Sequence, residues 1–369
     1  MRISCLKSFL LSGVQTVFKA VPSKTSMSIL ECILITADEN GIKLTANDME
    51  LGIETYIDGE VIIAGEIALE ARLFLDIVRS LPDSVVTIDS DDNYLTHVSC
   101  EKSNFNIIGR SSDEFSYLPD LNKNNPLIIS QFSLKEIINQ TIFSISDNDT
   151  NKLMTGELFE VKNNKFKVVS LDGHRISIRS IDLKNEYENM SVVIPGKTLK
   201  EVSKILPGDA DKDIYIYFTD NNVLFEFDKT IVVSRLIEGK YFNIDQMLSS
   251  DYETKINVNK KDLLDSIGRA TLLVNEGDKK PIIVTVGDDS MQLRINSTVG
   301  SMNEDIDIEK LGKDIMIGFN PRFLMDALRV IDDEIITLYM VNSKAPCIIK
   351  NEDTSYLYLV LPINFNVVS

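Results

Sequence analysis

The chain has 369 residues, of which 44% are hydrophobic and 25% charged, and its formal net charge is −18. This composition is typical of a globular protein and excludes a largely disordered chain. No apolar run approaches the roughly 20 residues that a membrane span needs, and the N-terminus has no signal-peptide cleavage pattern, so we expect a cytoplasmic protein without a membrane partner.

Six amphipathic helices are predicted along the chain. In chain order they cover about residues 6–21, 71–81, 134–145, 195–206, 260–274 and 321–331. Every second helix follows a short apolar strand, at residues 66–69, 191–194 and 314–317. Each of these helices also precedes a β-branched strand, at residues 85–88, 214–217 and 335–338. The same helix–strand unit is therefore predicted three times.

Polar turns separate the remaining strands. Asn40-Gly41 lies between two apolar runs, which is a strong hairpin signal. Residues 91–93, 162–164 and 220–222 are further predicted turns. Seven or eight strands per repeat against two helices predict an α+β fold, in which the helices cover one face of an antiparallel sheet.

A charge pattern recurs with the helices, at intervals of 125 residues. A base is followed four positions later by an acid and seven positions later by a second base, in the triplets Arg72-Asp76-Arg79, Lys197-Glu201-Lys204 and Arg322-Asp326-Arg329. These offsets place each triplet on one face of a helix, where the acid can pair with both bases. Apolar positions repeat in register with it: Phe74, Leu199 and Leu324, then Leu81, Leu206 and Ile331.

A repeat of this length predicts whole domains in tandem, since solenoid units run to only about 20–50 residues. We expect three domains, at residues 1–125, 126–250 and 251–369. Each has a normal size for one hydrophobic core.

The charge is divided between the elements. Five of the six predicted helices are net basic and one is neutral, so the strands and loops carry the acidic excess. Basic helix faces on an acidic protein favour contact with a polyanion. Any solvated helix face also carries lysines, and duplication could preserve a purely structural pattern, so both interpretations stay open from the charges alone.

Catalytic and metal motifs are missing from the sequence. The four cysteines are scattered without a CxxC pair, which predicts buried free thiols and no metal or cofactor. The segment around Asp172 and His174 could supply a general-base dyad, but an Asp-Gly turn with a polar histidine beside it is the simpler interpretation. We expect no catalytic residue and no enzyme activity.

Several short segments, in a fixed order, resemble one protein family. They are MSIL at 27–30, NDME at 47–50, DEFSYLP at 113–119, TGELFE at 155–160, DGHR at 172–175, RLIEGKY at 235–241 and YLVLPI at 358–363. In this order and over the whole length, the chain is similar to the bacterial sliding clamp family, the beta subunits of the DNA polymerase III holoenzyme.

The resemblance implies a DNA clamp fold in a head-to-tail homodimer that closes into a ring. The ring would encircle duplex DNA without reading its sequence, act as a processivity factor that tethers the replicative polymerase, and be opened by a clamp-loading ATPase. Other proteins with a clamp-binding motif would share its cleft, and the protein would be nucleoid-associated. The DNA-facing residues implied are Lys24, Arg72, Arg79, Asn148, Lys152, Lys197, Lys200, Lys204, Arg322 and Arg329.

The resemblance also implies a peptide-binding cleft between the second and third domains. Its residues here are Leu153, Met154, Leu171, Gly173, His174, Arg175, Ile176, Phe242, Gln246, Met247, Leu359, Val360, Leu361, Pro362 and Ile363. Phe242 and Ser249 stand where the family usually has proline, and Asn151 and Gln246 where some members have arginine.

The dimer interface implied by the resemblance would join Phe105 and Ile107 to Leu272 and Leu273.

Two other classes stay open. A three-domain cytoplasmic scaffold would bind proteins and never encircle DNA. An enzyme would depend on Asp172 and His174 and lose turnover on His174→Ala. Persistence on circular but not on linear DNA distinguishes a clamp from both.

Overall fold

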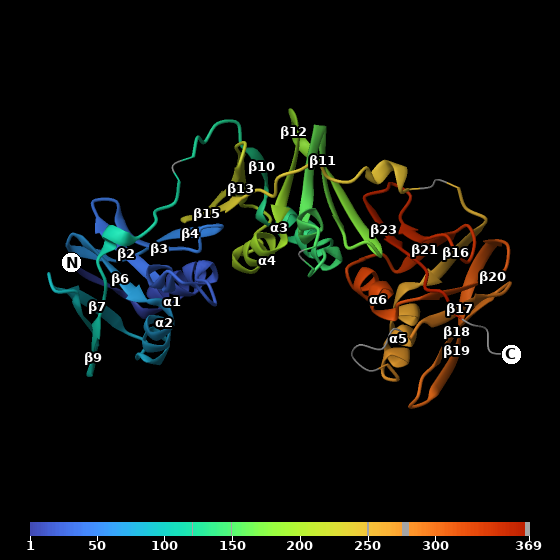
Figure 1. Ribbon diagram of the computed structural model, residues 1–369, viewed down its shortest axis with the longest axis horizontal. Helices are drawn as coiled ribbons and strands as arrows, with labels where there is room; N and C mark the ends of the chain where they lie inside the picture. Colours follow the sequence, from blue (N-terminus) through green and yellow to red (C-terminus); the bar gives the residue numbers. More distant parts are fainter. Residues whose placement is uncertain (120, 149, 249–250, 275–279, 366–369) are drawn as a thin grey trace. The chain divides into compact units, whose positions relative to one another are not determined.

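The computed structural model describes residues 1–119, 121–148, 150–248, 251–274 and 280–365. In these residues it contains six α-helices and 23 β-strands (Figure 1). The chain forms two compact units, one of residues 1–134 and 201–236 and the other of residues 135–200 and 237–369. The predicted domain boundary near Asn125 lies in the described residues, whereas the one at Ser250 lies outside them.

All six predicted helices are present. They are α1 Lys7–Val17, α2 Ala71–Ser80, α3 Gln131–Asn139, α4 Gly196–Ile205, α5 Lys260–Thr271 and α6 Pro321–Arg329. Side chains of Glu70, Asn259 and Asn320 accept hydrogen bonds from first-turn amides and cap α2, α5 and α6. α1 and α3 end earlier than predicted, and the short 3-10 turns η1 Phe18–Ala20 and η4 Ile142–Ser144 follow them.

The first unit contains two antiparallel sheets. The smaller has the order β5-β1-β7-β8-β9, with β5 Glu60–Ile63, β1 Arg2–Leu6, β7 Val85–Ser90, β8 Leu95–Cys100 and β9 Ser103–Ile108. The larger has the order β10-β13-β14-β15-β4-β3-β2-β6. Its strands are β10 Leu127–Ser130, β13 Asp213–Phe218, β14 Asn222–Phe227, β15 Thr230–Arg235, β4 Leu51–Ile57, β3 Gly41–Asn47, β2 Cys32–Asp38 and β6 Gly65–Glu70.

The second unit is built on one sheet of ten strands, in the order β11-β12-β23-β22-β21-β16-β19-β18-β17-β20. The strands are β11 Gly156–Leu171, β12 Arg175–Pro195, β23 Tyr356–Val360, β22 Cys347–Lys350, β21 Ile335–Met340, β16 Thr254–Asn259, β19 Ser301–Gly312, β18 Ser290–Asn296, β17 Ile282–Val286 and β20 Ile315–Phe319. α5 and α6 pack against each other beside this sheet (Figure 1).

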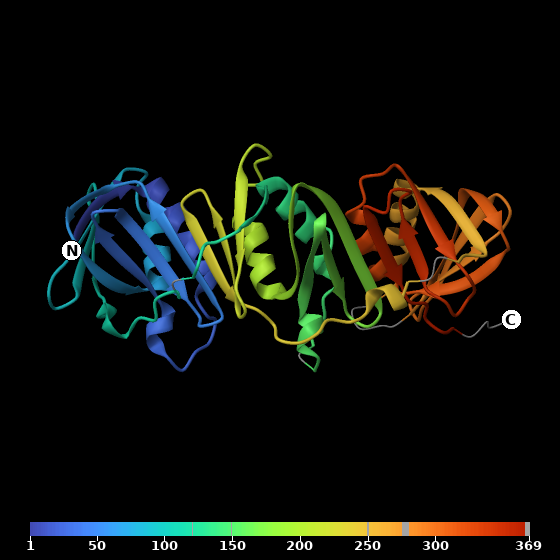
Figure 2. The same cartoon turned by 90° about the horizontal axis from the view of Figure 1, so that it is seen from above.

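Two sheets run across the predicted domain boundaries. β15 pairs with β4, and β12 pairs with β23, both antiparallel. Figure 2 shows the yellow β15 beside the blue strands and the green β12 beside the red strands. Each pairing covers a strand edge that would otherwise be exposed. This explains why the middle third of the chain is divided between the two compact units.

The turn predicted at residues 162–164 is wrong. β11 continues through it, with a shift of register on both sides of Asn163, whose φ is 56°. A bulge absorbs the polar residues without ending the strand. The described residues therefore hold six strands between Leu127 and Arg235, against nine before them and eight after.

The apolar positions that repeat in the sequence form the helix cores. Phe74, Leu199 and Leu324 are buried, as are the three positions at the helix ends, Leu81, Leu206 and Ile331. All four cysteines are buried free thiols, as predicted. The hydrophobic faces of these helices were thus correctly predicted from periodicity.

One buried carboxyl should make the stability depend on pH. Glu157 lies on β11 and is fully buried, and burial raises its pKa from 4.5 to about 8, against the lowering influence of the Thr141 hydroxyl and of Lys200. The folded state therefore holds a proton that the unfolded chain releases above pH 4.5. The bound proton contributes fully to the free energy of unfolding below pH 4.5. This contribution is lost as the pH rises to about 8, by roughly 1.4 kcal/mol per pH unit.

We expect Glu157→Gln to flatten the pH dependence of the free energy of unfolding between pH 5 and 8 and to stabilise the protein above this range. Urea denaturation across the range measures it. Glu160→Gln is the matched control, because the pKa of Glu160 is lowered, despite partial burial, by Lys167 and Lys162. An unchanged slope for Glu157→Gln would mean that this carboxyl is ionised in the fold.

Candidate partner cleft and charged helix faces

The bases of the three charged triplets are exposed on their helices, whereas the acids Glu201 and Asp326 are half-buried. All ten predicted DNA-facing side chains are exposed: Lys24, Arg72, Arg79, Asn148, Lys152, Lys197, Lys200, Lys204, Arg322 and Arg329. Solvated basic side chains on helices can contact a phosphate backbone without reading bases.

The acid of each triplet pairs with the second base. The ion-pair distances are 3.8 Å for Asp76–Arg79, 2.8 Å for Glu201–Lys204 and 4.0 Å for Asp326–Arg329. No ion pair between the acid and the first base is found for Arg72 or Arg322 in the described residues. In the first and third triplets, the acid is therefore paired with the second base and not with the first among the described residues.

An apolar cavity of about 330 Å³ lies where β12 meets β23. It is lined by Pro346 and by these predicted cleft residues: Met154, Leu171, Gly173, His174, Arg175, Ile176, Phe242, Met247, Leu359 and Leu361. A concave apolar surface with a few polar groups at its edge is typical of a ligand site.

A tight turn positions one wall of this cavity. β11 ends at Leu171 and β12 begins at Arg175, and Gly173 between them has φ 86°, which favours glycine. The Asp172 carboxylate accepts hydrogen bonds from the backbone amides of His174 and Arg175, at 2.9 and 3.1 Å. The DGHR segment thus forms a rigid corner at the cleft.

The other predicted cleft residues do not line the cavity: Leu153, Gln246, Val360, Pro362 and Ile363. Val360 points into the core of the second unit, and the amide of Ile363 donates to the carbonyl of Gly318. Pro346, in the turn between β21 and β22, was not predicted to line the cleft. Nothing local marks it, because strand pairing alone brings this turn to the cleft.

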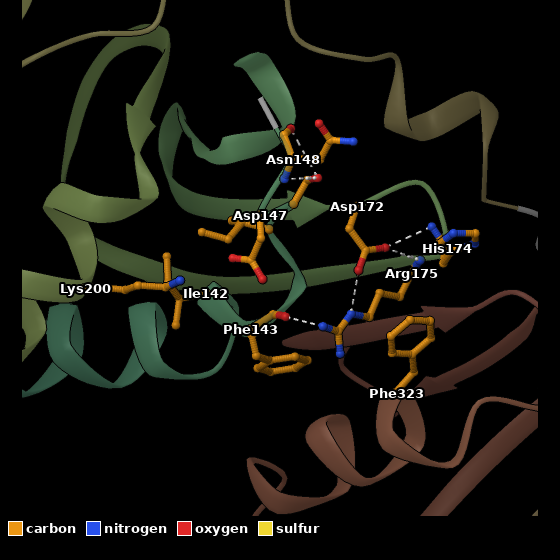
Figure 3. A pocket seen from close by; sticks show the side chains of 11 residues that line it. Ile142, Phe143, Asp147, Asn148, Asp172, His174, Arg175, Lys200 and Phe323 are labelled. Atoms are coloured by element: carbon orange, nitrogen blue, oxygen red, sulfur yellow. Dashed lines mark hydrogen bonds and ion pairs between the residues drawn. The ribbon is translucent and has the colours of Figure 1, made fainter. Parts of the chain in front are cut away.

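Arg175 is shared with a second cavity of about 600 Å³ beside the cleft (Figure 3). Its Nε donates to Asp172 at 2.9 Å and its Nη1 to Asp326 at 2.7 Å, while Nη2 donates to the carbonyl of Phe143. Its guanidinium carbon lies 4.4 Å from the ring centre of Phe323. Arg175 therefore joins the cleft wall to the acid of the third triplet on α6.

Asp172 and His174 do not form a catalytic dyad. The Asp172 carboxylate is engaged by Arg175 and by two backbone amides. The His174 ring instead stacks on Phe323, with ring centres 6.1 Å apart and an interplanar angle of 23°. These contacts fix the conformation of the turn between β11 and β12.

The described residues contain no cluster of His, Cys, Asp and Glu side chains that could hold a metal ion. In the same residues, no helix combines the length and apolar character that crossing a membrane requires.

The predicted dimer residues lie on exposed features. Phe105 and Ile107 are half-buried on β9, which ends its sheet and pairs only with β8 among the described strands. Leu272, just after α5, is 82% exposed, and Leu273 is half-buried. An unpaired strand edge and an exposed leucine are typical of an interface.

The fold and the site define a class: a protein of tandem two-helix domains with basic helix faces and an apolar cleft. Family models for the N-terminal, central and C-terminal domains of the DNA polymerase III beta subunit match residues 1–119, 128–243 and 245–364. The chain belongs to the DNA polymerase III beta subunit family, and its three tandem domains are clamp domains.

Relatives match over nearly the whole chain. The beta sliding clamp of Staphylococcus epidermidis is 33% identical, and the match covers 98% of this chain and 99% of the relative. The DNA polymerase sliding clamp of Bacillus subtilis has a TM-score of 0.95 at 32% identity, over 99% and 100% of the two chains. A protein from Eubacterium rectale, assigned as a DNA polymerase III beta subunit, is 64% identical with a TM-score of 0.96, over the same shares.

Proposed function

We propose that this chain is a DNA sliding clamp, a non-catalytic processivity factor that encircles duplex DNA and tethers the replicative polymerase. The observation that carries the proposal is the conjunction of the basic triplet, repeated on exposed faces of α2, α4 and α6, with an apolar cleft in the same chain. Attachment by encirclement needs only weak, sequence-independent phosphate contacts, which leave the clamp free to slide. A tethered polymerase then acts at a high effective concentration.

We place the domain boundaries near residues 125 and 250. The first lies between the N-terminal and central family matches, and the second lies within a few residues of the start of the C-terminal match at residue 245. Ring closure would join two copies through two identical contacts of the first domain with the third. The free edge of β9 would meet the first half of β19, which pairs with β18 while its second half pairs with β16. Leu273 lies close to the turn before β19, because a Cβ atom on Gly300 in this turn would lie 3.6 Å from the Cδ2 atom of Leu273. A closed ring leaves neither edge exposed.

The polymerase would bind the cleft through a short peptide, and the clamp-loading ATPase and other proteins with a clamp-binding motif would compete for it. The scaffold alternative is not favoured, since the relatives over the full length are sliding clamps. The test of the whole proposal is retention on DNA. The clamp should stay on nicked circular DNA and slide off after linearisation, and equal loss from both forms would contradict encirclement.

Partner binding should depend on a few apolar side chains at the cleft. Met247 and Leu361 line it and are 45% and 38% exposed, so Met247→Ala with Leu361→Ala leaves the core intact. We expect the pair to weaken binding of a peptide with a glutamine and a Leu-Phe end by about tenfold or more, because such sites concentrate affinity in a few anchors. Isothermal titration calorimetry measures this.

Removing the chain from Leu361 onward should abolish peptide binding and leave the dimer. The truncation also removes Ile363, whose amide bonds to Gly318 on β20, so the point variants are the cleaner test. Met316→Ala is the matched control, an exposed apolar side chain on β20 outside the cleft. Undiminished affinity of the double variant would place the partner site elsewhere.

A further inference from the structure

Strands of neighbouring repeats pair at two junctions, β12 with β23 at the partner cleft and β4 with β15, and the pairing at the two junctions has the same register. At the partner cleft, a row of directly paired residues crosses five strands: Leu171, Ile176, Leu359, Ile348 and Tyr339. Where β4 meets β15, the corresponding row is Asn47, Gly52, Val233, Leu224 and Tyr217. The two rows are built from corresponding strands of successive repeats, and each lies within one compact unit.

The turns that enter the two junctions also correspond. Asp48 accepts hydrogen bonds from the amides two and three residues later, at 3.0 and 2.7 Å, as Asp172 does at the cleft. Met49 has φ 76°, where Gly173 has φ 86°. Met49 adopts a left-handed conformation that is uncommon without glycine, so the fold requires this turn at both junctions.

The strands that leave the junctions correspond as well. The amide of Arg235 donates to the carbonyl of Glu50 at 3.0 Å, and the amide of Leu361 donates to the carbonyl of His174 at 2.9 Å. The junction of β4 with β15, here called the first junction, therefore has the same backbone arrangement as the partner cleft. Glu50 and Arg235 lie at its edge, at the positions that His174 and Leu361 have at the cleft.

The two rows of paired residues differ in side-chain size at their second position. Gly52 stands where the cleft has Ile176, and the space above it is filled by the chain itself. A Cβ on Gly52 would lie 1.9 Å from the Cδ2 atom of Leu118. Leu118 and Leu121 pack on the cluster of Tyr217, Leu224 and Val233.

The plugging segment is also held through its backbone. The Nδ2 atom of Asn47 donates to the carbonyl of Ser116 at 2.9 Å. Asn47 occupies the position that the apolar Leu171 has at the cleft, and its side chain holds the segment by this hydrogen bond. Leu118 and Leu121 thus place apolar side chains on this row of strand residues, as the apolar side chains of a partner peptide are proposed to do at the cleft.

We propose that the first junction is a second copy of the partner cleft, closed by the chain's own Ser116, Leu118 and Leu121, and that a partner-type peptide binds there once Leu118 and Leu121 are removed. This inference rests on the proposed function of the cleft. The native chain then presents one peptide site per protomer because the other is occupied from within. Glu50 and Arg235 give the closed site a charged edge, so its affinity for the apolar peptide is lower than that of the cleft.

The test is the number of peptides bound per protomer. The probe is a synthetic peptide with a glutamine and a Leu-Phe end, titrated by calorimetry and counted by native mass spectrometry. The full-length protein should bind one peptide, and Leu118→Ala with Leu121→Ala should bind two. Leu6→Ala with Leu95→Ala removes two exposed leucines elsewhere and should still bind one.

A second variant guards against loss of folding. Gly52→Ile with Leu118→Ala and Leu121→Ala gives the first junction the isoleucine that the cleft has, which restores an apolar surface there, and it should also bind two. One peptide per protomer in both folded variants overturns the inference. The proposed cleft is judged separately, on the unaltered protein, where absence of any peptide binding would contradict the proposed function instead.

Discussion

Leu272→Ala with Leu273→Ala should convert the dimer to monomers at micromolar concentration. Leu272 is 82% exposed and Leu273 half-buried in one chain, and the proposed contact covers both. Truncation of a fully buried leucine costs roughly 2–5 kcal/mol, and a closed ring contains the contact twice. The expected change in the dissociation constant is therefore several powers of ten.

Sedimentation equilibrium measures the change directly. Ile62→Ala is the matched control, an apolar side chain 49% exposed on β5, the opposite edge strand of the sheet that ends in β9. It should remain dimeric. An unchanged dimer for the double leucine variant would remove these residues from the interface. Loss of the folded state is checked by circular dichroism, because Leu273 also packs against the core of the second unit.

Reversal of the first base in all three triplets should impair contact with DNA. Arg72, Lys197 and Arg322 are exposed on α2, α4 and α6, so their replacement by Glu should leave the fold intact. Removing one phosphate interaction lowers the slope of log affinity against log salt by about one unit. We expect at least about tenfold less loading onto nicked circular DNA at ~0.1 M salt, with a weaker salt dependence.

The control has the same change in net charge on other elements. Lys102, Lys184 and Lys344 are exposed on strands and turns, and their replacement by Glu tests the overall field of the protein. It should reduce loading far less, because these lysines lie outside the repeated helix faces. Equal impairment of both triple variants would show that net charge, not the triplet, governs DNA binding.

The repeats and the helix faces could be derived from the sequence because they depend on local periodicity. The 3.6-residue period places Phe74, Leu199 and Leu324 on buried faces, and the bases of the triplets on exposed faces, before any tertiary contact is known. The Asn40-Gly41 hairpin followed from turn chemistry, and the structure has it between β2 and β3. These are short-range properties of the chain.

Long-range pairing decided the rest. The polar residues around Asn163 favour a turn locally, but pairing with β12 keeps β11 continuous through them. Glu157 lies between Gly156 and Leu158 in a strand, and only the elements that cover this strand make it fully buried. Pro346 reaches the cleft because β22 and β23 pair beside it.

The two junctions show the same division. The sequence by itself determined that the domains are repeated, that the helices are amphipathic and five of the six net basic, and that an apolar segment precedes the C-terminal end. Only the tertiary structure decided which junction is open. Ile176 lines an open cavity at the partner cleft, whereas Leu118 fills the space beside Gly52 at the first junction. Sequence periodicity reports the face on which a side chain lies, whereas strand pairing between distant segments determines what that face meets.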